Sequence, residues 1–70
     1  MNIDDLNAEI ARQGLTKPQL AKQMGISKKR LYSRLKGETT FKQEEIQKIA
    51  SILHLDNNKI MNIFFAELVS

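Results

Sequence analysis

The chain has 70 residues, of which 11 are basic and 8 are acidic, and it contains one histidine and no cysteine. A chain of this length forms one domain, residues 1–70, and the absence of cysteine excludes both a disulfide framework and a cysteine-based metal site. It has neither a run of about twenty apolar residues that could cross a membrane nor a secretory signal at its N-terminus, so we expect a cytoplasmic domain. With a single histidine and no cysteine, we expect it to need no metal, and we expect no other cofactor.

The first predicted helix follows from the spacing of apolar residues. Ile3, Leu6 and Ile10 recur at intervals that place them on one face of a helix running from about residue 3 to residue 12. Acidic residues in its first turn suit the positive end of the helix dipole. Gly14 is expected to end this helix in a left-handed conformation.

The second predicted helix begins with a strong signal. Thr16 and Gln19 have the spacing of a capping box, and Pro18 occupies the first turn, where a missing N–H costs little. Gly25 then allows the chain to turn with a positive φ. The inner face of this helix is formed by three residues, Leu20, Ala21 and Met24.

Three further helices complete the prediction. Ser27 caps a third helix, which stops at Gly37. After a loop, a fourth helix covers about residues 42–54, and Asp56 caps a fifth that covers about residues 57–68. Five short helices with short connections, and no stretch of alternating polarity, indicate a compact all-α domain.

Charge is segregated along the sequence. All eight acidic residues lie outside residues 10–37, and eight of the eleven basic residues lie inside that window. A surface that serves only solubility normally mixes both signs, so a window without acids predicts a local positive field that suits nucleic acid. The basic residues of the window are Arg12, Lys17, Lys22, Lys28, Lys29, Arg30, Arg34 and Lys36.

The second and third predicted helices have the spacing of a helix-turn-helix. This motif needs a small residue in its first helix, a residue that tolerates the left-handed conformation in its turn, and apolar residues that anchor its second helix. Ala21 and Gly25 meet the first two needs, and Ile26, Leu31 and Leu35 meet the third. An ordinary helical hairpin is the alternative, and the acid-free window favours DNA binding over it.

At these residues a resemblance becomes definite. The segment TKPQLAKQMGISKKRLYSRLKGETTFKQEEIQKIASILHL resembles the phage repressor and Cro-like helix-turn-helix family, also called the Xre family. The likeness covers residues 3 to about 65, and FKQEEIQKIASILHL with the ending IFF is similar to small phage-encoded regulators of Gram-positive hosts. The resemblance implies a five-helix repressor-like domain that binds operator DNA as a dimer, with its third helix in the major groove.

Two positions depart from the pattern of this family. Lys17 stands where the family usually carries a glutamine, and a lysine reaches a phosphate only as a point charge. Lys42 stands where a serine or threonine would cap the fourth helix, so we expect this helix either to start from Thr40 or to start poorly. Neither departure threatens the fold.

The residues expected to bind DNA fall into two sets. With Leu31 and Leu35 turned inward, the cap and outward turns of the third helix reach base edges, and flanking residues reach phosphates. For Tyr32 the alternative is half-burial against the fourth helix, and for any single lysine it is a purely solvated role. The predicted base-reading residues are Ser27, Lys28, Lys29, Tyr32 and Ser33. The predicted phosphate contacts are Lys17, Gln19, Arg30, Arg34, Lys36 and Lys42.

The last predicted helix carries two apolar stripes. Ile60, Ile63 and Phe64 form one, and a surface helix of a small domain buries only one stripe in its own core. The second is expected to be exposed in a monomer and to form the interface of a homodimer that recognises an inverted repeat. The alternative is that the helix tucks in deeply and only Met61 shows. The predicted interface residues are Met61, Phe65, Leu68 and Val69.

Other classes of function fit the sequence less well. An enzyme is not expected, because no catalytic set and no glycine-rich phosphate loop is assembled, and His54 is expected at a helix end rather than at a metal. A protein-interaction module that uses the last helix, such as an antirepressor or an antitoxin, stays open as the alternative. RNA binding is a weaker third option, because Tyr32 is the only aromatic residue of the basic surface. The sequence therefore predicts a transcriptional regulator that binds double-stranded DNA, and neither a membrane nor a small-molecule substrate.

Overall fold

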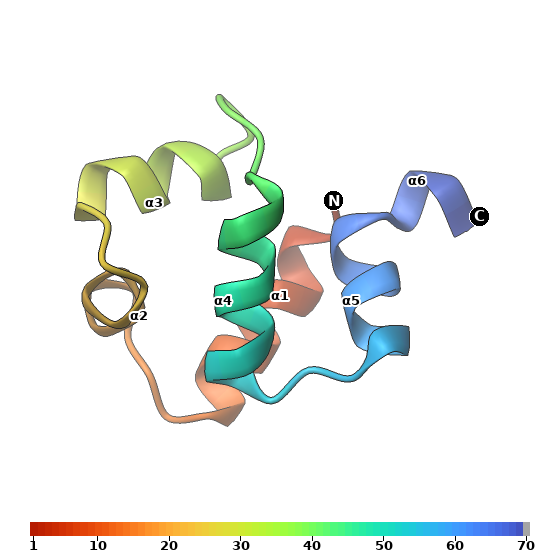
Figure 1. The fold of residues 1–70 in the computed structure, drawn as a ribbon, viewed down its shortest axis with the longest axis horizontal. Helices are drawn as coiled ribbons and strands as arrows, with labels where there is room; N and C mark the ends of the chain where they lie inside the picture. The colour runs from red at the N-terminus through yellow and green to blue at the C-terminus, as the bar shows by residue number, and fades with distance from the viewer. Residues whose placement is uncertain (70) are drawn as a thin grey trace.

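A computed structural model describes the backbone of residues 1–69 and the side chains of residues 1–68, and every regular element in that range is a helix. The all-α prediction is therefore confirmed. The body measures 31 × 24 × 20 Å, with α4 through its middle, α2 and α3 on one side, and α5 and α6 on the other (Figure 1). The helices are α1 (Ile3–Arg12), α2 (Lys17–Met24), α3 (Lys28–Leu35), α4 (Gln43–Leu53), α5 (Asn57–Phe64) and α6 (Ala66–Val69).

Side chains that accept backbone N–H groups determine where helices begin. Thr16 Oγ1 accepts the Gln19 N–H at 3.3 Å, and Gln19 Oε1 accepts the Thr16 N–H at 2.9 Å, so the predicted capping box is confirmed. Ser27 and Asp56 cap α3 and α5 as predicted, each accepting the N–H three residues later, at 3.1 and 2.8 Å. Each such cap stabilises its helix by about 1 kcal/mol.

The first four helices all end in a turn with one residue at positive φ. The angle is 70° at Gly14, 75° at Gly25, 83° at Gly37 and 56° at His54. After each of them, the next residue donates its N–H to the carbonyl five positions earlier, which is the wider hydrogen bond of a Schellman motif. The left-handed ending at Gly14 and the turn at Gly25 are therefore confirmed.

One apolar core joins α1 to α5. Ala21 is 1% exposed, so the small residue of α2 does lie inside, and Leu31 anchors α3 with no exposed surface. Burying a leucine or isoleucine side chain stabilises the fold by about 1.5–3 kcal/mol, so a core of this kind supports a 70-residue chain without disulfides. The buried apolar residues are Leu6, Ile10, Leu20, Ala21, Met24, Leu31, Ile49, Leu53, Ile63 and Phe64.

The start of α4 agrees with the fourth predicted helix, which covers about residues 42–54, but not with the alternative start at Thr40. The helix begins at Gln43 with Lys42 as its N-cap, so a start from Thr40 was wrong. A lysine side chain has no acceptor for the free N–H groups of a helix. The start is held by Glu45, whose Oε1 accepts the Lys42 N–H at 2.8 Å and so forms one half of a capping box.

The last predicted helix is two helices, so the expected number of five was also wrong. The helix is interrupted at Phe65, which lies between α5 and α6 and has φ −124° and ψ 33°. The N-terminal segment lies against this break (Figure 1). The Ile63 carbonyl, which a continuous helix would offer to Glu67, accepts the Asn2 N–H at 2.6 Å, and the Met1 amino group pairs with the Glu67 carboxylate. Contacts between the two ends of the chain therefore accompany the break.

Candidate nucleic-acid interface

Five of the eight basic residues of the sequence window lie on α3 or directly after it, and they are Lys28, Lys29, Arg30, Arg34 and Lys36. This helix is joined to α2 by three residues, Gly25, Ile26 and Ser27, and the two helices pack against each other. In Figure 1, α2 is seen end-on while α3 lies across the view, so the two axes cross steeply. Ile26 and Leu35 are partly buried against the core and Leu31 is fully buried. The opposite face of α3 is therefore left to solvent.

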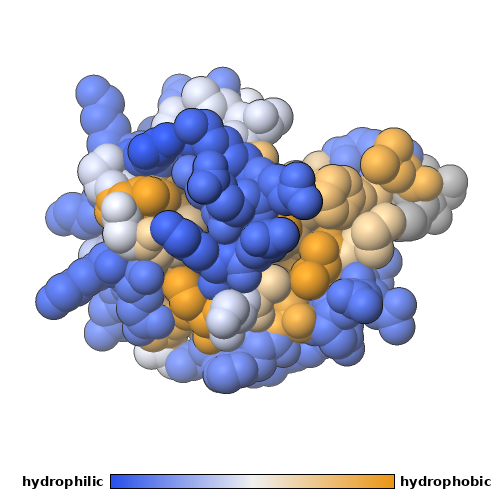
Figure 2. All heavy atoms as spheres, in the orientation of Figure 1, coloured by the Kyte–Doolittle hydropathy of each residue, from blue (hydrophilic) through white to orange (hydrophobic). Residues whose placement is uncertain are grey.

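That solvent face is polar and basic. Lys29, Ser33 and Lys36 follow one another at intervals of four and three residues, so they form one outward stripe. Lys28 and Lys29 are exposed, and so is Ser27, whose hydroxyl caps the helix. Hydrophilic side chains cover much of this side of the molecule in Figure 2. Four of the five predicted base-reading residues, Ser27, Lys28, Lys29 and Tyr32, are exposed, and Ser33 is half-buried.

Tyr32 keeps 39% of its surface exposed. It lines a hollow with Asn7 of α1 and with Lys17 and Pro18 of α2, and a second hollow with Leu35 of its own helix. The other residues that line these hollows belong to α1, α2, α3 and the segments that adjoin them. None of them belongs to α4, against which the alternative prediction packed Tyr32. The ring thus lies between the start of α2 and the outward face of α3.

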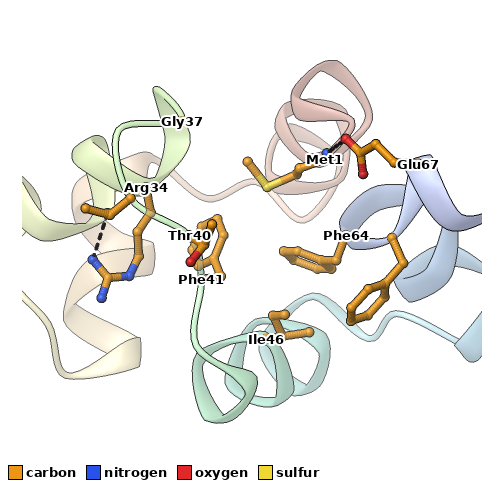
Figure 3. A pocket seen from close by; sticks show the side chains of 10 residues that line it. Met1, Arg34, Gly37, Thr40, Phe41, Ile46, Phe64 and Glu67 are labelled. Atoms are coloured by element: carbon orange, nitrogen blue, oxygen red, sulfur yellow. Dashed lines mark hydrogen bonds and ion pairs between the residues drawn. The ribbon is translucent and has the colours of Figure 1, made fainter.

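Arg34 is not where the sequence placed it. It was expected on an exposed flank as a phosphate contact, but the structure buries it to 7% exposure. Its Nε donates to Glu45 Oε1 at 2.6 Å and its Nη1 donates to Thr39 Oγ1 at 3.3 Å. Figure 3 shows its guanidinium turned toward the loop between α3 and α4. The Arg34 guanidinium is paired with Glu45 inside the protein. Arg34 is therefore not retained among the residues expected to contact phosphates.

Glu45 is the centre of this polar cluster. Burial opposes the charge of Glu45, but the Lys42 N–H, the Arg34 hydrogen bond and the charges of Arg34 and Arg30 outweigh it and lower the pKa of this carboxyl. Arg30 takes part from further away, with its Nε 3.6 Å from Glu45 Oε2 and its side chain 45% exposed. Arg30 therefore reaches α4 with part of its guanidinium and solvent with the rest.

The other predicted phosphate contacts lie on the surface. Lys17 and Gln19 are exposed in the first turn of α2, where Pro18 has no N–H and the Gln19 N–H is already donated to Thr16 Oγ1. The Gln19 side-chain oxygen is already occupied by the Thr16 N–H, so only its amide N–H groups can donate to a phosphate. Lys36 and Lys42 are exposed at the end of α3 and before α4.

One residue beside this face was missed by the sequence reasoning. Glu38 is the first residue after the acid-free window, and its Oε1 accepts a hydrogen bond from Ser33 Oγ at 3.1 Å. The carboxylate therefore lies against a predicted base-reading residue. The signal was present in the sequence as a glycine, Gly37, followed by an acid, because a left-handed glycine folds the next residue back over the helix.

The predicted dimer surface is only partly exposed. Met61 is 39% and Leu68 77% exposed, whereas Phe65 packs partly against the core. Phe65 turns inward because the chain leaves its helical path there. The fourth predicted residue, Val69, has a side chain outside the described residues.

Two apolar hollows lie next to this surface. One, of about 500 Å³, runs between α4 and α5 and is lined by Phe41, Ile46, Ala50, Ile60 and Phe65 together with two glutamines. The other, of about 440 Å³, lies between the α3–α4 loop and the N-terminus (Figure 3). There the rings of Phe41 and Phe64 meet edge to face, with centroids 5.6 Å apart. Hydrophobic residues gather on this side of the molecule in Figure 2.

No helix in the described part of the chain is long and apolar enough to cross a membrane. The side chains of residues 1–68 also bring together no group of three or more histidine, aspartate or glutamate residues that could hold a metal ion. His54 is exposed at the end of α4, in the left-handed turn that follows this helix.

The chain was compared with protein families, curated proteins and solved structures. A family model described as "Protein of unknown function (DUF739)" matches residues 2–67. The curated proteins gave no match, and neither did the solved structures.

Proposed function

Because the chain belongs to the DUF739 family, whose description assigns no function, we propose its function from its own geometry: it is a transcriptional regulator that binds double-stranded DNA in a sequence-specific manner. In this proposal α2 and α3 form a helix-turn-helix, and α3 enters the major groove. The role matches that of the phage repressor and Cro-like family, which the sequence resembles.

The observation that carries the proposal is the two-sided character of α3. Its inner side is anchored by Leu31 and by the buried Arg34. Its outer side presents Lys28 and Lys29, Lys36 follows directly after the helix, and no acidic residue lies between these lysines in the sequence. An anchored helix with a basic outer side meets both needs of a recognition helix, a fixed orientation and attraction to phosphate. A bundle helix that only faced water would need neither.

The proposed DNA contacts are of two kinds, to phosphates and to base edges. Lys17, Arg30, Lys36 and Lys42 contact phosphates and supply affinity that depends on salt. The amide N–H groups of Gln19 can join them. The base edges are read from the cap and the outward turns of α3, where lysine pairs with guanine and Tyr32 can pack on a thymine methyl. The residues proposed to read bases are Ser27, Lys28, Lys29, Tyr32 and Ser33.

We propose further that the regulator acts as a homodimer through the end of the molecule that carries α5 and α6. This end and α3 lie toward opposite ends of the longest dimension, 31 Å, so pairing there leaves both recognition helices free (Figure 1). The expected operator is an inverted repeat. Exposed Met61 and Leu68 support this surface.

The proposal is tested by selecting bound duplexes from a random pool with the purified protein at about physiological salt, where non-specific binding is weak. We expect an inverted repeat to be enriched. Lys29→Gln should abolish the enrichment or change the selected bases, while Lys59→Gln, which removes the same charge from α5, should select the wild-type sequence. Enrichment of no sequence by the wild-type chain would overturn the proposed function.

A second candidate function is a protein-interaction module that uses the apolar surface of α4, α5 and α6. The observation in its favour is the apolar hollow between α4 and α5, whose lining residues include no charged side chain. Such a module has no use for Lys28, Lys29 and Lys36 on α3. Loss of binding to a partner protein on changing Leu68, in a chain that selects no DNA sequence, would favour this second function.

A further inference from the structure

The four turns that end α1 to α4 share one hydrogen bond and differ in one residue. After each positive-φ residue the next N–H donates to the carbonyl five positions earlier, at 3.2, 3.1, 3.0 and 2.9 Å in chain order. The residue that donates this bond is folded back over the helix it follows, and it usually makes an apolar contact there. The four donors are Leu15, Ile26, Glu38 and Leu55.

Glu38 stands out among these donors. Leu15, Ile26 and Leu55 are partly buried and pack against the core, as this turn favours. Glu38 is exposed and charged, and it follows the most basic helix of the protein. An acid there weakens the attraction of α3 for any phosphate, so the turn alone does not explain its presence.

Two hydrogen bonds fix Glu38 against Ser33. The Glu38 N–H donates to the Ser33 carbonyl at 3.0 Å, and the Ser33 hydroxyl donates to Glu38 Oε1 at 3.1 Å. The first bond belongs to the turn, so the backbone conformation itself places the Glu38 carboxylate next to Ser33. Gly37, with φ 83°, sets this path.

A serine hydroxyl has one hydrogen to donate and two lone pairs to accept. With its hydrogen given to Glu38, Ser33 presents only acceptors to anything in front of it. In the major groove the amino groups of cytosine and adenine are donors, whereas guanine O6 and N7 and thymine O4 are acceptors. A serine whose hydroxyl hydrogen is already donated can accept a hydrogen bond from an amino group of cytosine or adenine. It cannot form a hydrogen bond with guanine O6 or thymine O4, because these atoms are also acceptors.

We propose that Glu38 is a specificity-determining residue that acts through Ser33: it orients the hydroxyl so that the operator carries cytosine or adenine at the base facing Ser33. This inference rests on the proposed function, since it requires α3 to lie in the major groove. Glu38 is a positioning residue in this scheme, and Ser33 makes the contact.

The test starts from the operator that the wild-type chain selects. Four duplexes that differ only at the base facing Ser33, located as the position at which Ser33→Ala loses its preference, are compared by competition. We expect the wild-type chain to favour cytosine or adenine there by roughly three- to tenfold, the worth of one hydrogen bond. In Glu38→Ala the hydroxyl is free to rotate and can donate as well as accept, so this preference should fall to less than twofold, with other positions unchanged.

Glu44→Ala is the matched control, because it removes an exposed acid from the first turn of α4, and should change affinity for all four duplexes alike. If Glu38→Ala also acts alike on all four, Glu38 contributes only charge and the inference is overturned. A wild-type preference for guanine or thymine at this position overturns it as well. These outcomes leave the proposed function standing, whereas failure of the wild-type chain to select an operator removes both.

Discussion

The Nε of Arg34 lies 2.6 Å from Oε1 of Glu45, and the two side chains are only 8% and 7% exposed. This buried pair joins the last turn of α3 to the first turn of α4. Because Glu45 also accepts the N–H of Lys42, the same carboxylate starts α4 and holds α3 against it. The orientation of α3 in the proposed function therefore depends on one acid that does not lie on α3.

Replacing Arg34 should destabilise the fold more than replacing a basic residue that faces water. Arg34→Met leaves the buried Glu45 carboxylate without its closest partner, and we expect a loss of about 3 kcal/mol in the free energy of unfolding. Urea unfolding measures it. Lys36→Met is the control, because Lys36 is exposed directly after α3, and it should cost less than about 1 kcal/mol. Equal losses in the two variants would contradict the role given to the buried pair.

Stability should fall in mild acid because of Glu45. Its pKa is lowered in the folded state below the ordinary value of 4.5, so the unfolded chain takes up the proton first as the pH falls. The stabilisation is complete above pH 4.5 and is lost as the pH drops from there through the folded pKa. Urea unfolding of the wild-type chain and of Glu45→Gln, measured from about pH 7 to pH 3, should show a shallower decline in the variant.

Glu67→Gln provides the comparison for this acid effect. The hydrogen bond from the Met1 amino group lowers the pKa of Glu67 as well, but this carboxyl is fully exposed, and solvent screens its charge. We expect its pH profile to stay close to that of the wild-type chain. A profile that Glu67→Gln flattens and Glu45→Gln leaves unchanged would show that the buried cluster is not the acid-sensitive part.

Lysines proposed to read bases and lysines proposed to contact phosphates should differ in how their loss changes binding to the selected operator. Lys29→Ala should lower discrimination at one or two base positions by roughly 1–3 kcal/mol. Lys36→Ala should weaken binding to all sequences alike and flatten the dependence of log K on log salt by about one unit. Fluorescence anisotropy at several salt concentrations measures both. An unchanged base preference and an unchanged salt slope in these variants would rule out the docking of α3 described above.

The proposed dimer surface should respond to charge at Leu68. This side chain is 77% exposed in the single chain, so Leu68→Asp should leave the monomer folded while it places a charge in the interface. We expect the dissociation constant of the dimer to rise at least about tenfold, measured by sedimentation equilibrium. Asn58→Asp adds the same charge to an exposed position of α5 and serves as the control. A dimer unaffected by Leu68→Asp would place the interface elsewhere.

The helices and their caps could be predicted from the sequence because they depend on residues close together in the chain. Apolar spacing located α1 at Ile3–Arg12, as the structure has it. The caps at Thr16 and Ser27 were recognised because each side chain accepts an N–H only three residues away. The left-handed turn at Gly25 follows from the lack of a Cβ.

The tertiary structure alone decided what distant residues do to one another. Arg34 has the same local pattern as its exposed neighbours, and only the approach of Glu45 from α4 buries it. The break at Phe65 coincides with a hydrogen bond from Asn2, which lies at the other end of the chain. Local patterns determine which backbone groups can pair within a turn of helix, but the burial of a charge or the end of a helix depends on which helices meet. Which helices come into contact depends on how the whole core packs.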